Sequence, residues 1–388
     1  MHIKHLSLSN FRNYSTLELP LQPGVNLLVG RNGQGKTNLV EAIFYAATLN
    51  SHRVSGYLPL VKHQQEKAVM RILAGFEDRE NLIELELNVS GSNRARINRS
   101  DTPRVRDVLG LVSAVIFSPE DLDIVKRDPA QRRAFIDDLL VQLTPRLAGV
   151  FSDYDRVLKQ RNTLLKTSRN LPKNSPGLDT LAAWDDSLIK LGTEIISFRQ
   201  DLIRRIATPL LSSYEAIADE KNNPTIKYKS SLTGSNIVEP EVFVEDFLVT
   251  SDKVEIENQF RTKLELVKAK ELERGISLVG PHRDDLVLYL GDYPAKGFVS
   301  HGESWSYALA LKLASAQLLR EEARAGDPIL ILDDVFAELD STRRTRLAQL
   351  VSDNEQVIIT AAVVEDVPSE LSSNRIFVNA GEIVVGNE

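Results

Sequence analysis

Residues 30–37, Gly-Arg-Asn-Gly-Gln-Gly-Lys-Thr, have the spacing of a phosphate-binding loop. They lie between a short apolar run at 25–29 and helical apolar spacing at 36–48, where such a loop must sit. The glycines let backbone N–H groups converge on phosphate oxygens, and the helix N-terminus adds positive potential. A chance glycine turn is the alternative, and the correct flanks argue against it. The loop therefore predicts a nucleotide site.

Within this loop, we expect Lys36 to hold the β- and γ-phosphates of ATP and Thr37 to bind Mg²⁺ through its hydroxyl. Arg12 lies on a strand beside the loop and is a further candidate for a phosphate contact. The residues predicted to bind ATP are Arg12, Gly30, Arg31, Asn32, Gly33, Gln34, Gly35, Lys36, Thr37 and Asn38.

A pair of acids follows the apolar run at 329–332. The strand-end aspartate of P-loop proteins holds the metal, so Asp333 is the predicted Mg²⁺ ligand with Thr37. Asp334 is placed to polarise the attacking water, and Asp334 and Lys36 are the predicted catalytic residues. An aspartate after a strand is also a common helix N-cap, but its combination with the phosphate loop favours the metal role.

A serine-glycine turn, Ser300-His301-Gly302-Glu303-Ser304, precedes another predicted helix, and a Leu-Asp turn ending at Asp340 follows the acids. Exposed N–H groups and a serine hydroxyl at a helix start form an anion site, although a plain N-cap is an alternative. The order of the motifs resembles that of ABC-type ATPases. This resemblance implies that Ser300, Gly302 and Glu303 close on the γ-phosphate bound by a second subunit, that Asp340 lies in the D-loop, and that the chain forms an ATP-dependent homodimer.

The remaining pattern predicts an α/β head, a mixed sheet with flanking helices, built from residues 1–140 and 275–388. Predicted strands are 3–11, 25–29, 68–76, 82–89, 112–117, 286–290, 329–332 and 357–360. Predicted helices are 36–48, one starting at Asp128-Pro129, 304–324 and 342–351. We expect the last third to form a hydrophobic parallel core.

Residues 141–274 are predicted to form an inserted helical arm or lid. Apolar residues at spacings of three and four run from Leu147 to Leu165 and from Leu181 to Leu202, separated by a breaker-rich stretch at 169–177. We interpret this as an antiparallel hairpin whose second helix has about 30 residues and a length of about 45 Å. Trp184 and Phe198 fall on the apolar stripe and are predicted to be core residues.

Composition limits the compartment and the partners. The chain of 388 residues has no cysteine, six histidines and a net charge of −7, which favours a reducing cytoplasm and excludes thiolate metal sites. No apolar run approaches the roughly 18 to 20 residues that span a bilayer, so no membrane partner is expected. The negative charge means that any DNA contact must be local.

The strongest local positive charge lies at residues 93–106, which contain five arginines and one aspartate. Arg94 and Arg96 would share one face of a strand, and with Arg99 they are candidates for contacts to DNA phosphates. A solvated edge strand that discourages aggregation is an equal alternative. Arg132 and Arg133 are expected to pair with acids of the helical arm.

Several motifs resemble the RecF family of bacterial recombination mediators over nearly the whole chain. They are residues 10–14 (Asn-Phe-Arg-Asn-Tyr), 30–38, 119–137, 280–285 (Gly-Pro-His-Arg-Asp-Asp) and 332–340. The chain departs from the family at Arg127, where glycine is usual, and at His301-Gly302-Glu303, where Gln-Gly-Gln is commoner. The resemblance implies a nucleoid-associated ATP-dependent clamp on single-stranded, double-stranded or junction DNA, with RecR and RecO as partners and RecA as an indirect one.

Two groups common in ABC-type ATPases are missing from this chain. No glutamine stands near Val115, and no histidine stands at 358–360, where Thr360 is a possible substitute. We therefore expect slow ATP hydrolysis. Alternative functions are an ABC transporter ATPase subunit, which would need a membrane partner, a chromosome-structuring ATPase of the SMC or Rad50 type, which would need a far longer arm, and a small-molecule kinase, which would act as a monomer.

Overall fold

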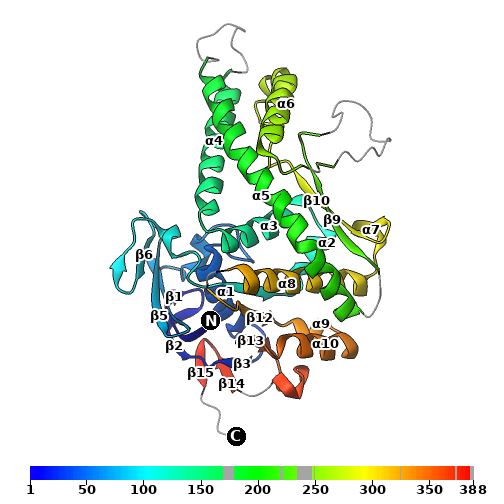
Figure 1. Ribbon diagram of the computed structural model, residues 1–388. Coiled ribbons are helices and arrows are strands. Elements are labelled where there is room, and N and C mark those ends of the chain that lie inside the picture. The colour runs from blue at the N-terminus through cyan, green and yellow to red at the C-terminus, as the bar shows by residue number, and fades with distance from the viewer. Residues whose placement is uncertain are drawn as a thin grey trace.

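The computed structural model describes residues 1–168, 179–218, 222–233, 247–248, 250–323, 325–371 and 374–384. The breaker-rich stretch at 169–177 lies outside the described residues. Figure 1 shows a head that contains the strands and a helical arm that projects from it. The predicted α/β head with an inserted helical arm is therefore the observed fold class.

The central six-stranded sheet has the order β15-β14-β3-β13-β12-β8 and is parallel except for β15. Its strands are β3 (Gly24–Val29), β8 (Ala114–Phe117), β12 (Ile329–Asp333), β13 (Gln356–Ala361), β14 (Asn374–Asn379) and β15 (Glu382–Val384). β8, β12 and β13 are buried along their whole length, which explains their mainly apolar sequences. Because β3 and β12 run in parallel, the residues that follow them meet at one edge.

A second six-stranded sheet is antiparallel, with the order β2-β1-β4-β5-β6-β7. Its strands are β1 (His2–Phe11), β2 (Tyr14–Pro20), β4 (Lys67–Phe76), β5 (Arg79–Asn88), β6 (Arg94–Ile97) and β7 (Ser100–Asp101). Alternation of buried and exposed residues, clearest in β2 and β5, is the pattern of a sheet with one solvated face.

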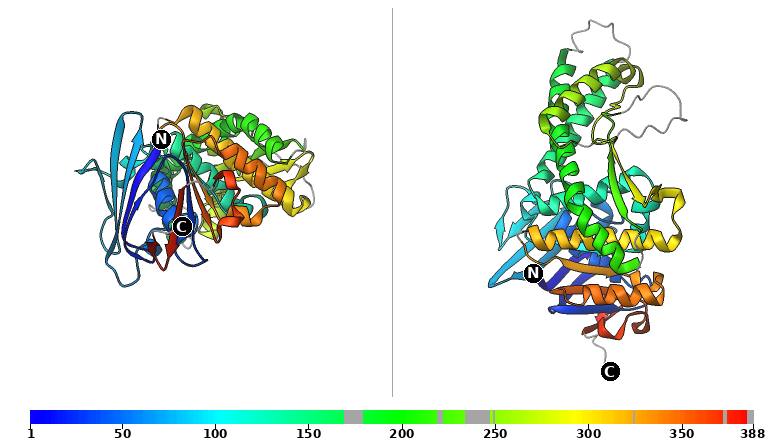
Figure 2. Two further views of the ribbon diagram at one scale, coloured as in Figure 1. Left: turned by 90° about the horizontal axis from the view of Figure 1, so that it is seen from below. Right: turned by 45° about the vertical axis from the view of Figure 1, so that its right-hand side comes forward.

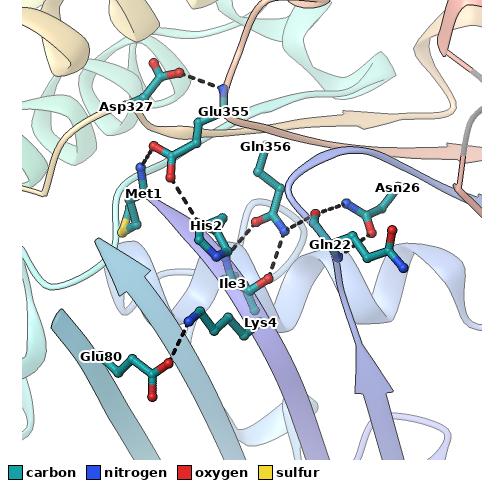
Figure 3. Close-up of polar contacts among 10 residues, drawn as sticks. All are labelled: Met1, His2, Ile3, Lys4, Gln22, Asn26, Glu80, Asp327, Glu355 and Gln356. Carbon is teal, nitrogen blue, oxygen red and sulfur yellow. Dashed lines mark hydrogen bonds and ion pairs between the residues drawn. The ribbon is translucent and has the colours of Figure 1, made fainter. Parts of the chain in front are cut away.

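The start of the chain ties the two sheets together (Figure 3). The Met1 ammonium forms an ion pair with Glu355, just before β13. The amide of Gln356 accepts a hydrogen bond from Ile3 N at 2.8 Å and donates to Ile3 O at 2.8 Å and to Gln22 O at 2.9 Å. These buried bonds fix β1 against the strand whose far end carries Thr360.

Helices cover both sheets. α1 (Lys36–Thr48) contributes buried residues to a core cluster shared with both sheets. α8 (His301–Glu322) packs against the central sheet on one side and α5 on the other, as Figure 1 shows. The other head helices are α2 (Leu122–Lys126), α3 (Pro129–Leu143), α7 (Ala295–Phe298), α9 (Val335–Glu338) and α10 (Ser341–Val351). Pro129 opens α3, as the sequence predicted.

The arm contains α4 (Leu147–Ser168), α5 (Asp179–Ala218) and α6 (Lys253–Arg274), and Figure 2 shows it projecting away from both sheets. The hairpin is confirmed, but its second helix has 40 residues and a length of about 60 Å, so the prediction of about 30 was wrong. The helix continues through Pro209, which tertiary packing tolerates. Trp184 and Phe198 pack on the core cluster, as predicted.

The arm helices are joined by the fully buried Arg161. Its guanidinium donates to Asp185 on α5 at 2.7 Å, to Glu271 on α6 at 2.6 Å and to Ser277 at 2.7 Å. The third helix, α6, escaped the sequence analysis because its mean hydropathy is low and its buried residues are few. The boundaries at residues 140 and 275 stay a prediction.

A separate three-stranded antiparallel sheet, β11-β10-β9, lies where the arm returns to the head. Its strands are β9 (Pro224–Lys229), β10 (Asp285–Leu290) and β11 (Tyr293–Pro294). The strand expected at 286–290 therefore exists but does not belong to the parallel core. Strand periodicity shows which face is buried and does not specify the partner strand.

Paired arginines fasten the arm to the head. Arg199 of α5 forms two hydrogen bonds with Asp137 of α3, at 2.8 and 2.7 Å. Arg132 binds Asp285 at 2.8 and 2.9 Å, and Arg133 donates to Asp284 O at 2.7 Å. The expectation that these last two pair with acids of the arm was therefore wrong. Their partners lie in the 280–285 segment.

Candidate nucleotide site

The loop after β3 has the backbone that a phosphate-binding loop needs. Gly33 and Gly35 have φ values of +83° and +115°, which L side chains rarely adopt. A Cβ on Gly30 would come 2.2 Å from Val378 O, so only glycine fits there. Lys36 is buried and its Nζ donates to Gly30 O at 2.6 Å. The ammonium therefore lies inside the loop, where it can hold a phosphate.

The first acid of the pair meets the loop directly. Thr37 Oγ1 donates to Asp333 Oδ1 at 3.1 Å, and Thr360 Oγ1 donates to the same oxygen at 2.6 Å. Thr360 Oγ1 also accepts from Asp334 N at 3.0 Å. The structure thus joins the ends of β3, β12 and β13 in one cluster, and Thr360 organises both acids where other ABC-type ATPases often carry histidine.

Burial controls the protonation of the two acids. It raises the pKa of Asp333 to about 6, the charge of Asp334 adds to this, and the hydrogen bonds from Thr360 and Thr37 oppose it. Burial also raises the pKa of Asp334, and the Lys36 charge opposes that rise. Asp334 has φ of +52° and lines a hollow of about 240 Å³ with Asn32 and Thr360. The hollow gives a reacting water a place beside the carboxylate.

The cluster suits Mg²⁺. Among the described residues, no three or more histidine, cysteine, aspartate or glutamate side chains gather to hold a metal by themselves. Mg²⁺ commonly takes only one or two protein oxygens and fills its shell with substrate phosphates and water. The Thr37 hydroxyl and the Asp333 carboxylate supply such a pair, and a cation would relieve the unfavourable burial of that carboxylate.

The β14–β15 turn braces the phosphate loop from outside. Ala380 N donates to Gln34 Oε1 at 2.5 Å, and Gly381 N donates to Gln34 O at 3.1 Å. Asn13 Nδ2 donates to the same carbonyl at 3.3 Å. The side chain of Gln34 is therefore turned to the C-terminal hairpin. A turn at Ala380-Gly381 could be read from the sequence, but its contact with the loop could not.

Other predicted ATP contacts have partners within the head. Arg12 forms a two-bond ion pair with the buried Glu41 of α1, at 2.8 and 2.6 Å. Asn38 donates to Asn13 at 2.7 Å and accepts from Arg53 at 3.1 Å. Arg53 was missed because an isolated arginine after a helix has no distinguishing pattern. Arg31 and Asn32 are exposed at the tip of the loop.

The serine turn forms a complete capping box at the start of α8. Ser300 Oγ accepts from Glu303 N at 3.2 Å, and Glu303 Oε2 accepts from Ser300 N at 2.7 Å. Arg343 bridges this turn to the D-loop, because it forms an ion pair with Asp340 and a Cβ on Gly302 would lie 3.0 Å from its Nη2. The structure brings the turn and Asp340 together through Arg343, and the hydrogen bonds of Lys36 run to the phosphate loop instead.

 Arg343 of α10 therefore links the turn to Asp340, and His301 of the turn also contacts Lys126 of α2 at 3.0 Å. The role of the turn in a second subunit stays a prediction.

The candidate DNA arginines form part of a charge ladder on the antiparallel sheet. Arg94 and Arg96 are exposed on one face of β6, as predicted, and stand opposite Glu86 and Glu84 of β5. Arg96 Nε also pairs with Asp101 at 2.7 Å. Glu84 and Glu86 also pair with Arg71 and Lys67 of β4, at 2.7 and 2.9 Å, so they offset the charge of the β6 arginines only in part. Arg99 lies in the exposed turn with φ of +71°.

Together, the phosphate loop, the strand-end acids and the serine turn on this fold define an ABC-type ATPase head. A family model described as "RecF/RecN/SMC N terminal domain" matches residues 2–379. The chain is 50% identical over 385 residues to the DNA replication and repair protein RecF of Leifsonia xyli subsp. xyli, covering 99% of each chain. It is 50% identical over 386 residues to that of Streptomyces avermitilis, again covering 99% of each. The chain belongs to the RecF family of DNA replication and repair proteins.

Solved structures agree with this assignment. A structure of the recombination mediator protein RecF with ATP has a TM-score of 0.86 at 28% identity and covers 99% of this chain and 97% of its own. The form described as RecF-ATPrS has a TM-score of 0.85 at 29% identity, covering 98% and 97%. An SMC head bound to part of ScpA, at 15% identity and a TM-score of 0.50, shares the fold. In the described part of this chain, none of the helices could cross a lipid bilayer as an apolar segment.

Proposed function

We propose that two copies of this chain close around ATP and that the closed dimer acts as a clamp on DNA during recombinational repair. The observation that carries the proposal is the cluster of Lys36, Thr37 and Asp333 at one edge of the central sheet. The Ser300 turn offers a second anion site whose contacts lie elsewhere in its own chain. A partner's γ-phosphate would give that turn a ligand.

In this proposal, ATP binds residues 30–38, and Mg²⁺ is held by Thr37 and Asp333. Ser300, Gly302 and Glu303 of the second copy complete each site, and Asp340 lies beside them. Asp334 polarises the attacking water while Lys36 offsets the phosphate charge. Hydrolysis is slow, because the chain has no glutamine near Val115 and no histidine at 358–360, and the activating carboxylate is Asp334 rather than glutamate. Loss of the γ-phosphate then weakens the dimer.

The cellular role follows from the family. The relatives carry the name DNA replication and repair protein RecF, and the solved structures are assigned to the RecFOR pathway. We infer that the clamp binds gapped or junction DNA in the cytoplasm, acts with RecR and RecO, and helps to load RecA on single strands. Arg94, Arg96 and Arg99 remain candidates for DNA contacts. The head at 1–140 and 275–388 would serve the nucleotide, and the arm at 141–274 would flank the DNA.

The proposal is tested by fluorescence anisotropy of a labelled gapped duplex with the full chain. We expect tight binding with Mg-ATP, weak binding with Mg-ADP, and weak binding by Lys36→Met under either condition. Lys62→Met is the matched control and should leave DNA affinity unchanged, because among the described residues the Lys62 ammonium bonds to Asn13 O and the Ser15 hydroxyl at the surface. Equal DNA affinity with ATP, ADP and no nucleotide would rule out an ATP-operated clamp.

A further inference from the structure

A large cavity lies where the arm meets the head. Its volume is about 1170 Å³, and its walls come from the segment after α1, the 104–109 segment, α3, and the bases of α4 and α5. It is separate from the hollow beside Asp334. We call this cavity the arm-base groove.

The arm-base groove has an excess of arginines. Arg53, Arg104, Arg106 and Arg133 line it. Across the described residues, the guanidinium groups of the last three form no ion pair within 4.0 Å, although Arg133 donates to Asp284 O, and Arg53 reaches Glu41 only at 4.0 Å. A fifth arginine, Arg199, is neutralised by its ion pair with Asp137.

Two further carboxyls line the groove and offset this charge incompletely. Burial raises the pKa of Asp138 to about 7, and burial also raises the pKa of Asp155. At neutral pH the groove therefore presents four guanidinium groups and two carboxyls. The Asp138 carboxyl is about half protonated at that pH, because its pKa is about 7. Unpaired arginines in a concave wall are suited to phosphate, since the planar guanidinium can donate two parallel hydrogen bonds to its oxygens.

Ring-bearing side chains accompany the arginines. His52 lines the groove, and both of its ring nitrogens are buried with no hydrogen-bond partner in the described structure. Half-buried Phe151 of α4 lines the groove as well. A basic groove with rings along it matches the requirements of a nucleic-acid strand better than those of an acidic peptide, because bases stack on rings.

We propose that the arm-base groove holds the sugar-phosphate backbone of a DNA strand, with Arg104 and Arg106 as phosphate contacts. This inference rests on the proposed DNA clamp and names the surface that does the binding. It differs from the first candidates on β6, where Arg96 pairs with Asp101 and both arginines lie near a sheet edge, outside the arm-base groove.

The arm-base groove also communicates with the nucleotide. Arg53 reaches from its wall to Asn38, the residue after Thr37, at 3.1 Å. Arg53 also approaches the buried Glu41 of α1, whose main partner is Arg12. A strand that draws Arg53 into the groove would loosen its contact with Asn38, and an ordered phosphate loop would hold Arg53 back. Occupancy of the two sites is therefore coupled through this one side chain.

The test is the anisotropy assay with Mg-ATP, run at several salt concentrations on full-length variants. Arg104→Ala/Arg106→Ala should weaken DNA binding by roughly tenfold or more. It should also lower the slope of log affinity against log salt by about 1.8, since each lost phosphate contact on duplex DNA removes about 0.9. Arg156→Ala/Arg320→Ala is the matched control, because it also removes two exposed arginines, each paired with an aspartate away from the groove, and its slope should stay within error of wild type. Arg94→Ala/Arg96→Ala tests the competing β6 surface, and we expect it to lower the slope less than the groove variant does.

Arg104→Ala alone is the second variant, because Arg104 is exposed while Arg106 packs near Gly149. If the double variant loses stability, the single variant should still lower the slope by about 0.9. Loss of slope in the β6 variant with none in the groove variants would overturn the inference and leave the DNA clamp intact. Unchanged DNA binding together with lost binding of an acidic protein segment would also overturn it. Failure of wild type to bind any DNA would remove the proposed function and this inference together.

Discussion

Thr360→Val tests how the strand-end acids are held. Valine matches threonine in shape and removes the hydroxyl that donates to Asp333 at 2.6 Å and accepts from Asp334 N at 3.0 Å. The backbone bond from Asp334 N to Thr360 O at 3.3 Å remains. The main loss is therefore one hydrogen bond to the charged form of Asp333, at a position that is almost fully buried.

The size of the effect follows from that bond. A hydrogen bond to a charged group is worth about 1.5–3 kcal/mol, and one pKa unit corresponds to about 1.4 kcal/mol. The substitution should therefore raise the pKa of Asp333, already about 6 in the native protein, by about one to two pH units. Mg²⁺ needs the ionised carboxylate. Metal-dependent ATP affinity is lost as pH falls through that pKa, so the loss should begin at higher pH in the variant.

The assay is titration with a fluorescent ATP analogue from pH 5 to 9, with Mg²⁺ and with a chelator. The phosphates of ATP titrate in the same range, so the informative quantity is the difference between variants. Thr345→Val is the control, because Thr345 is exposed and its hydroxyl bonds only to Ser341 O at 3.0 Å. The reasoning fails if the midpoint of Thr360→Val matches wild type, or if it moves equally without Mg²⁺.

Three further predictions concern single substitutions. Asp333→Asn removes a carboxyl whose pKa is raised from 3.8 to about 6. This raised pKa lowers the free energy of unfolding of wild type as pH increases from about 4 to about 6. Without metal, the variant should therefore match wild type near pH 4 and exceed it by up to roughly 3 kcal/mol at pH 8 in urea unfolding, and equal stability at both pH values would contradict this. Gln34→Met removes the acceptor for Ala380 N. It should weaken ATP binding by about 2- to 10-fold and leave the melting temperature nearly unchanged. Unchanged ATP affinity would show that the C-terminal turn does not order the phosphate loop. Arg161→Met leaves Glu271 buried without its partner and should cost about 3–5 kcal/mol in urea unfolding, against less than about 0.5 kcal/mol for the exposed Arg156→Met.

The sequence predicted the nucleotide side of the molecule well because local pattern and chemistry coincide there. The loop at 30–37 has a fixed spacing, and the apolar strand before Asp333 ends at the same sheet edge. The sequence alone therefore located both the phosphate loop and Asp333. Parallel strands bring such ends together without further information. Thr360 could be named as an organiser from its place at the next strand end.

The parts that were missed depend on contacts far apart in the chain. Nothing local in Gln34 indicates that it meets Ala380, and nothing in Arg53 indicates that it reaches Asn38. The strand at β10 was found, but its antiparallel partner β9 comes from the arm. The β6 arginines illustrate the same limit, because a count of charges along the chain does not include the charged residues across the sheet. Their contact with DNA stays a prediction.

The most direct test of the account is sedimentation velocity of the full chain with Mg-ATP and with Mg-ADP, comparing wild type with Ser300→Asp. Aspartate keeps the N-cap that Ser300 provides to α8, so the variant should melt like wild type. Its carboxylate would repel a partner's γ-phosphate. We predict that wild type dimerises with ATP and not with ADP, and that Ser300→Asp stays monomeric with both. A wild-type monomer at saturating ATP, or a Ser300→Asp dimer, would contradict a nucleotide site shared between two copies.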